Sequence, residues 1–152
     1  MADIAFESLS RWYGEAPRRT VLDRVSGTIH AGEFVVVVGR SGSGKSTLLN
    51  LLGGLETPSD GVVRIDGTDI AALGDRALTA LRRRRMGFVF QAYNLIPTLS
   101  VGDNLRLPLS LNGLPDDGRV EEWLERVGLG GRSGDWPDRL SGGEQQRVAI
   151  AR

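Results

Sequence analysis

The segment FVVVVGRSGSGKSTLLNLL, residues 34–52, constrains the fold more than any other stretch of the sequence. Phe34 to Gly39 is an unbroken run dominated by valines, which is typical of a strand buried on both faces of a parallel sheet. A glycine-rich turn follows, and Lys45 to Leu52 is apolar on most sides, which predicts a buried helix. The segment therefore predicts an α/β fold with a parallel-sheet core around the turn.

The turn itself, GRSGSGKST, has the residue types and spacing of a phosphate-binding loop. Its glycines permit positive φ, so that consecutive N–H groups can surround an anion, and the helix beginning near Gly44 adds the positive end of its dipole. Lys45 can reach the β- and γ-phosphates, and the Ser46 hydroxyl can ligate Mg²⁺. A turn without a ligand needs neither residue, so we expect a nucleoside triphosphate site. Its expected contacts are Gly39, Ser41, Gly42, Ser43, Gly44, Lys45, Ser46 and Thr47.

The rest of the chain falls into a β-rich part and a helical part. Alternating or apolar runs predict an edge strand over 4–9, short strands around Gly27 over 20–30, a half-exposed strand over 62–67 and a strand over 87–90, with a helix over 75–85. After Ala92 the pattern is helical. Ser100 can cap a helix over 101–111 that Pro108 must kink or end, and a second helix runs from 116 to 127. We expect one domain with a β-rich lobe (1–91), a helical lobe (92–140) and a final turn with the start of its helix (141–152).

Composition excludes several classes of protein. Nineteen Lys and Arg balance nineteen Asp and Glu, so no overall charge favours nucleic acid, and no nucleic-acid partner is expected. Arg82 to Arg85 are interpreted as solvated cations that complement a helix C-terminus. The chain has no cysteine, and His30, its one histidine, is expected at the surface. No apolar run approaches the ~18 residues that a membrane span needs. The guanine-reading motif N-K-x-D does not occur, which counts against a GTPase.

A second glycine-rich turn, Ser141 to Gly143, precedes the last predicted helix. A hydroxyl, two flexible residues and free N–H groups make it a second candidate anion site. Both turns can hold one nucleotide within a domain, or the second turn can meet the γ-phosphate bound to another copy. The spacing alone does not choose between them.

The sequence LSGGEQQRVAIAR, residues 140–152, resembles the signature motif of the ATP-binding-cassette (ABC) ATPases. With GRSGSGKST before it and FVFQ between, the resemblance covers essentially the whole chain. It implies a P-loop NTPase cassette with an antiparallel β lobe, a parallel-sheet core and a helical lobe. In this family two cassettes bind two ATPs head to tail, which implies that Ser141, Gly142 and Gly143 contact a γ-phosphate in trans.

The same resemblance assigns two further positions. Gln91 matches the glutamine that meets Mg²⁺ or the attacking water and relays occupancy to a membrane subunit. Tyr13 in RWYG resembles the aromatic residue that stacks on adenine, although Trp12 can serve instead and either ring can simply cover the core. The expected cofactors are ATP and Mg²⁺. Ser46 and Gln91 are the expected metal ligands, and the expected catalytic residues are Lys45, Gln91 and Ser141.

In this family, the acidic strand and the switch histidine lie beyond the signature helix, and the sequence ends at Arg152 without them. The resemblance thus implies a cassette whose C-terminal strands are missing. We expect these 152 residues alone to be aggregation-prone or partly molten and to hydrolyse ATP negligibly.

The resulting hypothesis is the ATP-binding subunit of an ABC transporter. LLGGLETPSDGVVRIDG and FVFQAYNLIPTLSVGDNLRLPL resemble the branch of lipoprotein-releasing and macrolide-export ATPases. The partners implied are a second cassette and an integral membrane permease, with a cytoplasmic location on the inner face of the cell membrane. The alternatives are a non-transport ABC ATPase, such as a cell-division regulator, and an inactive truncated remnant.

Overall fold

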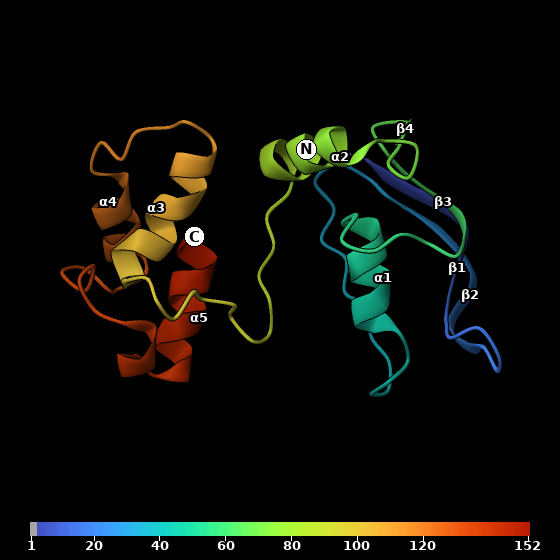
Figure 1. The fold of residues 1–152 in the computed structure, drawn as a ribbon, viewed down its shortest axis with the longest axis horizontal. Helices are drawn as coiled ribbons and strands as arrows, with labels where there is room; N and C mark the ends of the chain where they lie inside the picture. The colour runs from blue at the N-terminus through green and yellow to red at the C-terminus, as the bar shows by residue number, and fades with distance from the viewer. Residues whose placement is uncertain (1–2) are drawn as a thin grey trace. The chain divides into compact units, whose positions relative to one another are not determined.

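The computed structural model describes residues 3–152, which form two compact units that meet in sequence between Gly87 and Phe88. The first unit contains β1 (Ile4–Tyr13), β2 (Arg19–Ile29), α1 (Lys45–Leu52), β3 (Asp60–Ile65), β4 (Thr68–Asp69) and α2 (Asp75–Arg85) (Figure 1). The second unit contains α3 (Val101–Leu111), α4 (Arg119–Arg126), the short 3₁₀ helix η1 (Pro137–Arg139) and α5 (Gly142–Ala151). The predicted bounds of α1 and α2 are confirmed.

The strands of the first unit form one antiparallel sheet in the order β2-β1-β3-β4. β1 is an inner strand, since Ile4 pairs with Ile29 of β2 and with Ile65 of β3. The prediction of an edge strand was therefore wrong, because both partners of β1 come from later in the chain. β2 is continuous through Gly27, where a Cβ would lie 2.7 Å from the ring of Phe6. The glycine makes room for that ring instead of ending the strand.

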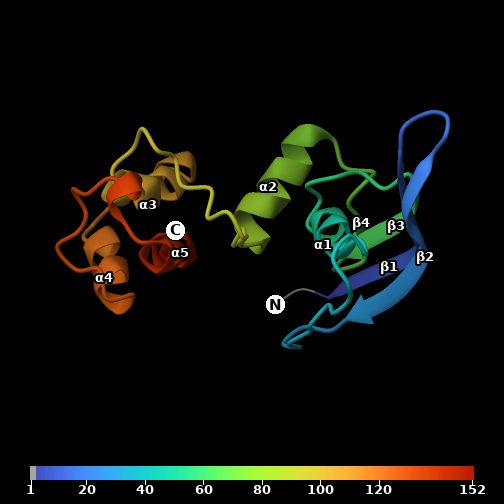
Figure 2. The ribbon, with the colours of Figure 1, turned by 90° about the horizontal axis from the view of Figure 1, so that it is seen from below.

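Helix α1 packs on one face of this sheet, as the two views in Figures 1 and 2 show. Leu51 and Leu52 of α1 are buried, whereas Leu49 is 56% exposed, so the helix is less covered than its sequence predicts. Burial of apolar side chains between the helix and the sheet stabilises this unit. The buried core residues are Phe6, Leu9, Leu22, Leu51, Leu52, Val63, Ile65 and Ile70.

The predicted strands at residues 34–39 and 87–90 are not formed in the part of the chain that the structure describes. Phe34 is 92% exposed and Val38 is 83% exposed. A strand needs a neighbour for its N–H and C=O groups, and no segment among residues 3–152 pairs with either run. The parallel-sheet core expected around the loop is thus absent from the described residues. The apolar character of the valine run predicts that it is buried, but it does not predict which segment pairs with it as a strand.

The arginine run at the end of α2 is less uniformly solvated than expected. Arg82 donates a hydrogen bond to the carbonyl of Gly54 at 2.6 Å, and Arg85 pairs with Asp66. Arg83 and Arg84 are exposed. All four lie in the last turn of the helix, where positive charge complements its dipole as predicted.

The second unit packs α3, α4 and α5 around a separate apolar core. Ser100 caps α3, as predicted, by accepting a hydrogen bond from the N–H of Asp103 at 3.1 Å. Pro108 lies inside α3 and does not end it. α4 is shorter than its predicted range of 116–127 because it begins only after Gly118, whose φ is 94°. The core residues are Val101, Leu105, Leu109, Val120, Leu124, Leu129, Leu140 and Val148.

One fully buried polar side chain, Asn104 of α3, orders the loop in front of that helix. Its amide oxygen accepts from the N–H of Ile96 at 2.8 Å, and its amide nitrogen donates to the carbonyl of the same residue at 3.1 Å. Further bonds reach the carbonyls of Leu99 and Ser100. Because every polar atom of the side chain is paired, its burial costs little.

Among the described residues 3–152, no helix has the length and apolar character needed to cross a membrane.

Candidate functional site

The loop between Gly39 and Gly44 folds back under the side chain of Lys45. The Lys45 ammonium group donates to the carbonyl oxygens of Gly39 and Arg40, both at 2.9 Å. The N–H of Ser43 donates to the Arg40 carbonyl at 3.2 Å, which closes a tight turn. The loop therefore holds a cation directly above its own backbone.

Glycines are required at both ends of this loop. Gly44 has φ of 89°, and a Cβ there would lie 2.9 Å from the carbonyl oxygen of Val21. A Cβ on Gly39 would lie 2.8 Å from the Ser43 hydroxyl. Gly42 also has positive φ, 79°, with open space on its side-chain side. The backbone thus turns where only glycine fits without strain.

The loop leads directly into the N-terminus of α1, which lacks a side-chain cap. Gly44 is the N-cap residue, and the first turn carries no acidic residue. The N–H groups of Lys45, Ser46 and Thr47 therefore have no intrahelical partner, and the positive end of the dipole adds to them. Ser41, Gly42, Ser43 and Ser46 are exposed. Backbone donors, a helix end and an ammonium group thus converge on a site suited to a polyanion.

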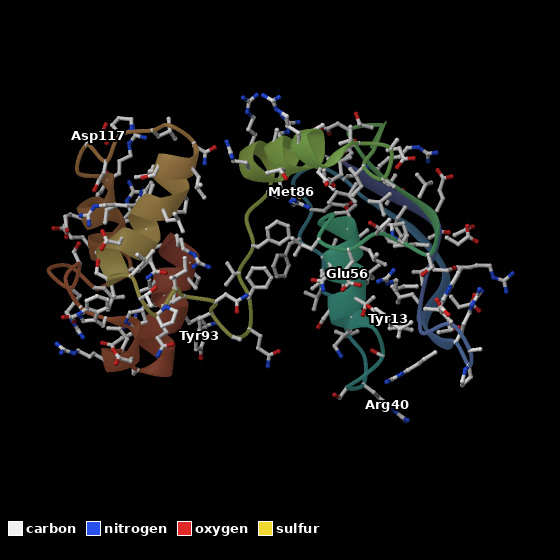
Figure 3. The ribbon with its side chains drawn as sticks, viewed as in Figure 1. Tyr13, Arg40, Glu56, Met86, Tyr93 and Asp117 are labelled. Atoms are coloured by element: carbon white, nitrogen blue, oxygen red, sulfur yellow. The ribbon has the colours of Figure 1, made fainter. Side chains whose placement is uncertain are left out.

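Tyr13 lies at the end of β1 and is 40% exposed. Its hydroxyl donates to Glu56 Oε2 at 2.7 Å, and the guanidinium of Arg11 lies over its ring at 4.6 Å from the centroid. The neighbouring Trp12 is covered in a similar way by Arg18, at 5.2 Å. Figure 3 shows Tyr13 and Glu56 beside α1, with Arg40 marking the loop that leads into the helix.

Gln91 lies in the second unit, in a turn that is closed by a hydrogen bond from the N–H of Tyr93 to the carbonyl of Phe90 at 3.0 Å. Its side chain is exposed. Before it, the rings of Phe88 and Phe90 stack with centroids 6.0 Å apart. Tyr93 and Asn94 after it both have positive φ, 60° and 50°. Gln91 thus lies exposed in a sharply turned segment.

The Ser141–Gly143 segment is the start of α5 and not a separate turn. Ser141 is the N-cap, and Gly142 and Gly143 are the first two helical residues. The hydroxyl and the N–H of Ser141 both donate to Glu144 Oε2, at 2.7 and 2.8 Å, while the Glu144 N–H donates back to the hydroxyl at 3.4 Å. These bonds from Ser141, with Arg132 at 3.3 Å adding a positive charge, hold the pKa of Glu144 below its usual range. An ionised carboxylate therefore lies at this helix end.

The segment after Gln91 contacts both ends of α5. Arg152 donates to the carbonyl of Asn94 at 2.7 Å and to that of Tyr93 at 3.4 Å. At the other end, a Cβ on Gly142 would lie only 3.1 Å from the Tyr93 hydroxyl oxygen. The Gln91 turn and α5 are thus tied together within the second unit.

The structure places the predicted site residues in two groups. The loop residues 39–47 and Tyr13 lie in the first unit, and Gln91 lies with Ser141, Gly142 and Gly143 in the second. Sequence reasoning missed Glu56, Tyr93 and Arg152, whose partners are distant in sequence and leave no local signal. It also missed Glu144, although a serine followed three residues later by glutamate is the pattern of a capping box.

Comparison with known proteins identifies the family of this chain. The ABC transporter family matches residues 22–152. The chain is 52% identical over 141 residues to the macrolide export ATP-binding/permease protein MacB of Rhodospirillum rubrum, covering 91% of this chain and 22% of that protein. It is 49% identical over 142 residues to the pyoverdine export ATP-binding/permease protein PvdT of Pseudomonas savastanoi pv. phaseolicola, with the same coverage of 91% and 22%. The chain thus spans about a fifth of the length of these relatives.

A solved structure is similar as well. The dimeric structure of a post-hydrolysis state of the ATP-binding cassette MJ0796, bound to ADP and Pi, has a TM-score of 0.89 and 40% sequence identity. The match covers 97% of this chain and 67% of that one. The fold is therefore that of a P-loop ABC cassette, with helices and an antiparallel sheet. By its matched residues, its glycine loop and its fold, the chain belongs to the ABC transporter family.

Proposed function

We propose that residues 39–47 bind the phosphates of ATP, with Lys45 on the β- and γ-phosphates. The observation that carries this is the position of Lys45, whose ammonium group lies 2.9 Å from two loop carbonyls beside the uncapped start of α1. Support comes from the cassette MJ0796, which was solved with ADP and Pi. Tyr13, exposed at the end of β1, then stacks on the adenine.

Mg²⁺ fits the residues present. Mg²⁺ in nucleotide sites usually keeps several waters and takes only one or two protein ligands in addition to phosphate oxygens. Ser46, exposed in the first turn of α1 next to Lys45, offers such a hydroxyl, and Gln91 offers a neutral amide oxygen. When bound, the ion would neutralise charge on the phosphates. The protein's own part is to align them through Lys45 and the loop N–H groups.

We further propose that the start of α5 binds the γ-phosphate held by a second copy. Ser141, Gly142 and Gly143 are exposed at a helix N-terminus, where a hydroxyl and N–H groups suit an anion. The dimeric state of MJ0796 supports the pairing of two copies. Under this proposal 1–91 is the nucleotide lobe, 92–140 the helical lobe, and 141–152 the segment that meets the other copy.

ATP-driven pairing then does work on a membrane permease, of the export or lipoprotein-release type, that holds the protein on the inner face of the cell membrane. The names of the two export relatives, which are ATP-binding/permease proteins, support this. Crosslinking in intact cells should join the protein to a membrane-spanning permease. Crosslinks confined to soluble proteins would contradict the transport proposal.

The nucleotide proposal is tested by sedimentation velocity with a slowly hydrolysed ATP analogue and Mg²⁺. Dimers are expected with the analogue and monomers with ADP, since only the triphosphate presents a γ-phosphate to the second copy. A protein that binds the analogue and stays monomeric would contradict the shared site.

We also propose that the 152-residue polypeptide alone turns over ATP negligibly and is prone to aggregate. The run leading into the loop, which includes Phe34 and Val38, is exposed and has no strand partner among residues 3–152, so apolar surface stays in contact with water on that side of the loop. Appreciable turnover together with a sharp two-state melt would contradict this.

A further inference from the structure

Glu56 and three other side chains of the first unit form a connected cluster. Its Oε2 accepts from the Tyr13 hydroxyl at 2.7 Å, and its Oε1 accepts from the Asn50 amide at 2.9 Å. Arg11 Nε lies 3.4 Å from Oε2, and another nitrogen of the same guanidinium donates to the carbonyl of Thr57 at 2.9 Å. The cluster links the end of β1, the last turns of α1 and the segment that follows α1.

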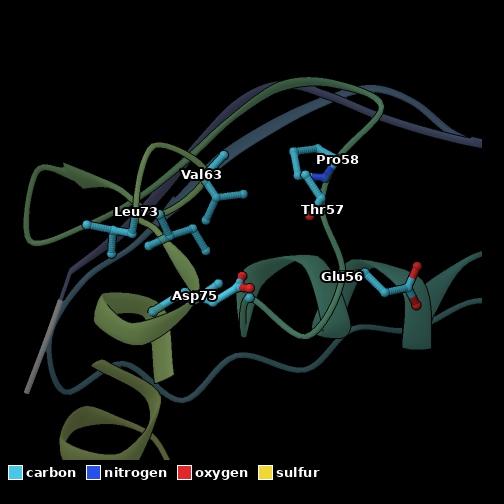
Figure 4. Close-up of a pocket in the computed structure, with 10 residues that line it drawn as sticks. Glu56, Thr57, Pro58, Val63, Leu73 and Asp75 are labelled. Carbon is cyan, nitrogen blue, oxygen red and sulfur yellow. The ribbon is translucent and has the colours of Figure 1, made fainter. Parts of the chain in front are cut away.

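The carboxylate of Glu56 points into this cluster and not into the neighbouring pocket. Glu56 and Asp75 contribute to the lining of that pocket, about 200 Å³, together with apolar residues such as Val63 and Leu73. Figure 4 shows the Glu56 carboxylate directed away from them, along α1. The Glu56 carboxylate therefore bonds to Asn50 of α1 and to Tyr13 at the end of β1.

This arrangement fixes how Tyr13 can meet a base. Its hydroxyl is already used as a donor to Glu56, and the guanidinium of Arg11 covers one face of its ring. Only the other face is available for stacking, and the ring cannot swing away from this position by rotation about its Cα–Cβ bond without breaking the bond to Glu56. A ring held in one orientation loses less entropy when a base stacks on it.

We propose that Glu56 is a positioning residue for nucleotide binding, which holds the Tyr13 ring through its hydroxyl, opposite Arg11, so that one face is preset for the purine of ATP. This rests on the proposed ATP site. The charge on Glu56 supports it, because hydrogen bonds from Asn50 and Tyr13, together with Arg11, hold the pKa of the carboxyl below its usual range. Glu56 is thus ionised at neutral pH and a strong acceptor for the phenol.

The test is a double-mutant cycle on ligand binding with Glu56→Ala, Tyr13→Phe and the combined variant. Dissociation constants are measured by calorimetry for Mg-ATP and for inorganic tripolyphosphate, which has phosphates and no base. Glu15→Gln, at an exposed position in the turn after β1, is the matched control for loss of an acidic side chain near Tyr13.

Each single variant should raise the Kd for ATP about three- to tenfold, the loss of roughly one hydrogen bond. The combined variant should be no worse than the weaker binder of the two, because both changes remove the same bond. Tripolyphosphate binding should be unchanged in all three, and Glu15→Gln should bind both ligands like the wild type.

Additive losses, no loss for ATP, or an equal loss for tripolyphosphate would overturn the positioning role while leaving the ATP site standing. A wild-type protein that is soluble and folded but binds neither ligand would instead overturn the ATP site, and this inference with it.

Discussion

The ammonium group of Lys45 donates to the carbonyl oxygen of Gly39 at 2.9 Å, across the turn of the glycine loop. The same group bonds to the carbonyl of Arg40. The ammonium charge gains more from phosphate oxygens than from two neutral carbonyls, because a phosphate oxygen carries an opposite charge and adds a Coulomb attraction to the hydrogen bond. The lysine is thus placed at the loop before a polyanion arrives.

Lys45→Ala should abolish this arrangement and weaken Mg-ATP binding by about a hundredfold or more, since a hydrogen-bonded charge partner is worth several kcal/mol. The measurement is the Kd for ATP by calorimetry. Arg83→Ala removes an exposed cation from α2 and should leave binding unchanged. Equal affinity of the Lys45 variant and the wild type would show that the loop does not hold the phosphates.

Ser141→Asp should prevent ATP-induced pairing without unfolding α5. Aspartate is as good an N-cap as serine, so the helix keeps its cap, but a second carboxylate at the γ-phosphate repels it. Sedimentation with the ATP analogue should show association weakened by about a hundredfold.

The matched control is Ser100→Asp at α3, because Ser100 is also an N-cap serine whose hydroxyl bonds to an acidic residue three positions later, at 2.7 Å. Both variants keep an N-cap but place a second carboxylate beside the acidic residue three positions later, so their melting temperatures should change to a similar extent, and only the Ser141 variant should lose pairing. Unchanged pairing of Ser141→Asp would remove the start of α5 from the site.

Glu144→Gln should strengthen ATP-induced pairing. The ionised Glu144 carboxylate competes with a phosphate for the Ser141 hydroxyl and repels it, whereas glutamine keeps the capping box without the charge. We expect about a threefold to tenfold tighter dimer, measured by sedimentation. Glu121→Gln, in the first turn of α4, removes the same charge from another helix start and should have no effect. Weaker pairing of the Glu144 variant would show that the Glu144 carboxylate supports phosphate binding at the start of α5 and does not oppose it.

The loss of unfolding free energy at acid pH should depend in part on Glu56. Its pKa in the folded protein is lowered from the ordinary value of 4.5. Its contribution is therefore fully present above that value and is lost as the pH falls through the lower folded-state pKa. Urea unfolding from pH 7 to pH 3 (about the range where carboxyls titrate) should show wild type and Glu56→Gln converging at the acid end. A constant gap between them at all pH values would contradict the lowered pKa.

Local sequence was enough to predict the elements that local physics determines. α1 begins after Gly44 because a glycine turn leads into a leucine-rich segment, and Ser100 caps α3 through its own hydroxyl. The glycine loop was predicted from its residue types, their spacing and its place before a helix, since its conformation depends on residues next to one another.

What sequence could not predict depends on partners that are far away. β1 was mistaken for an edge strand because its second neighbour, β3, begins only at Asp60. The bond between Tyr13 and Glu56 spans 43 positions, and that between Arg152 and Asn94 spans 58. The valine run after Phe34 was predicted to form a buried strand. Whether it forms one depends on a pairing segment elsewhere, and the residues of the run do not identify that segment.

The claim that ATP is bound between two copies is tested most directly by mixing two inactive variants. Lys45→Ala and Ser141→Asp should each stay monomeric with Mg²⁺ and the ATP analogue. Their mixture should form heterodimers in sedimentation, because the intact loop of one variant faces the intact α5 start of the other and restores one complete site. A mixture that stays monomeric, while each variant is folded and the wild type dimerises, would show that both segments serve a nucleotide within one copy.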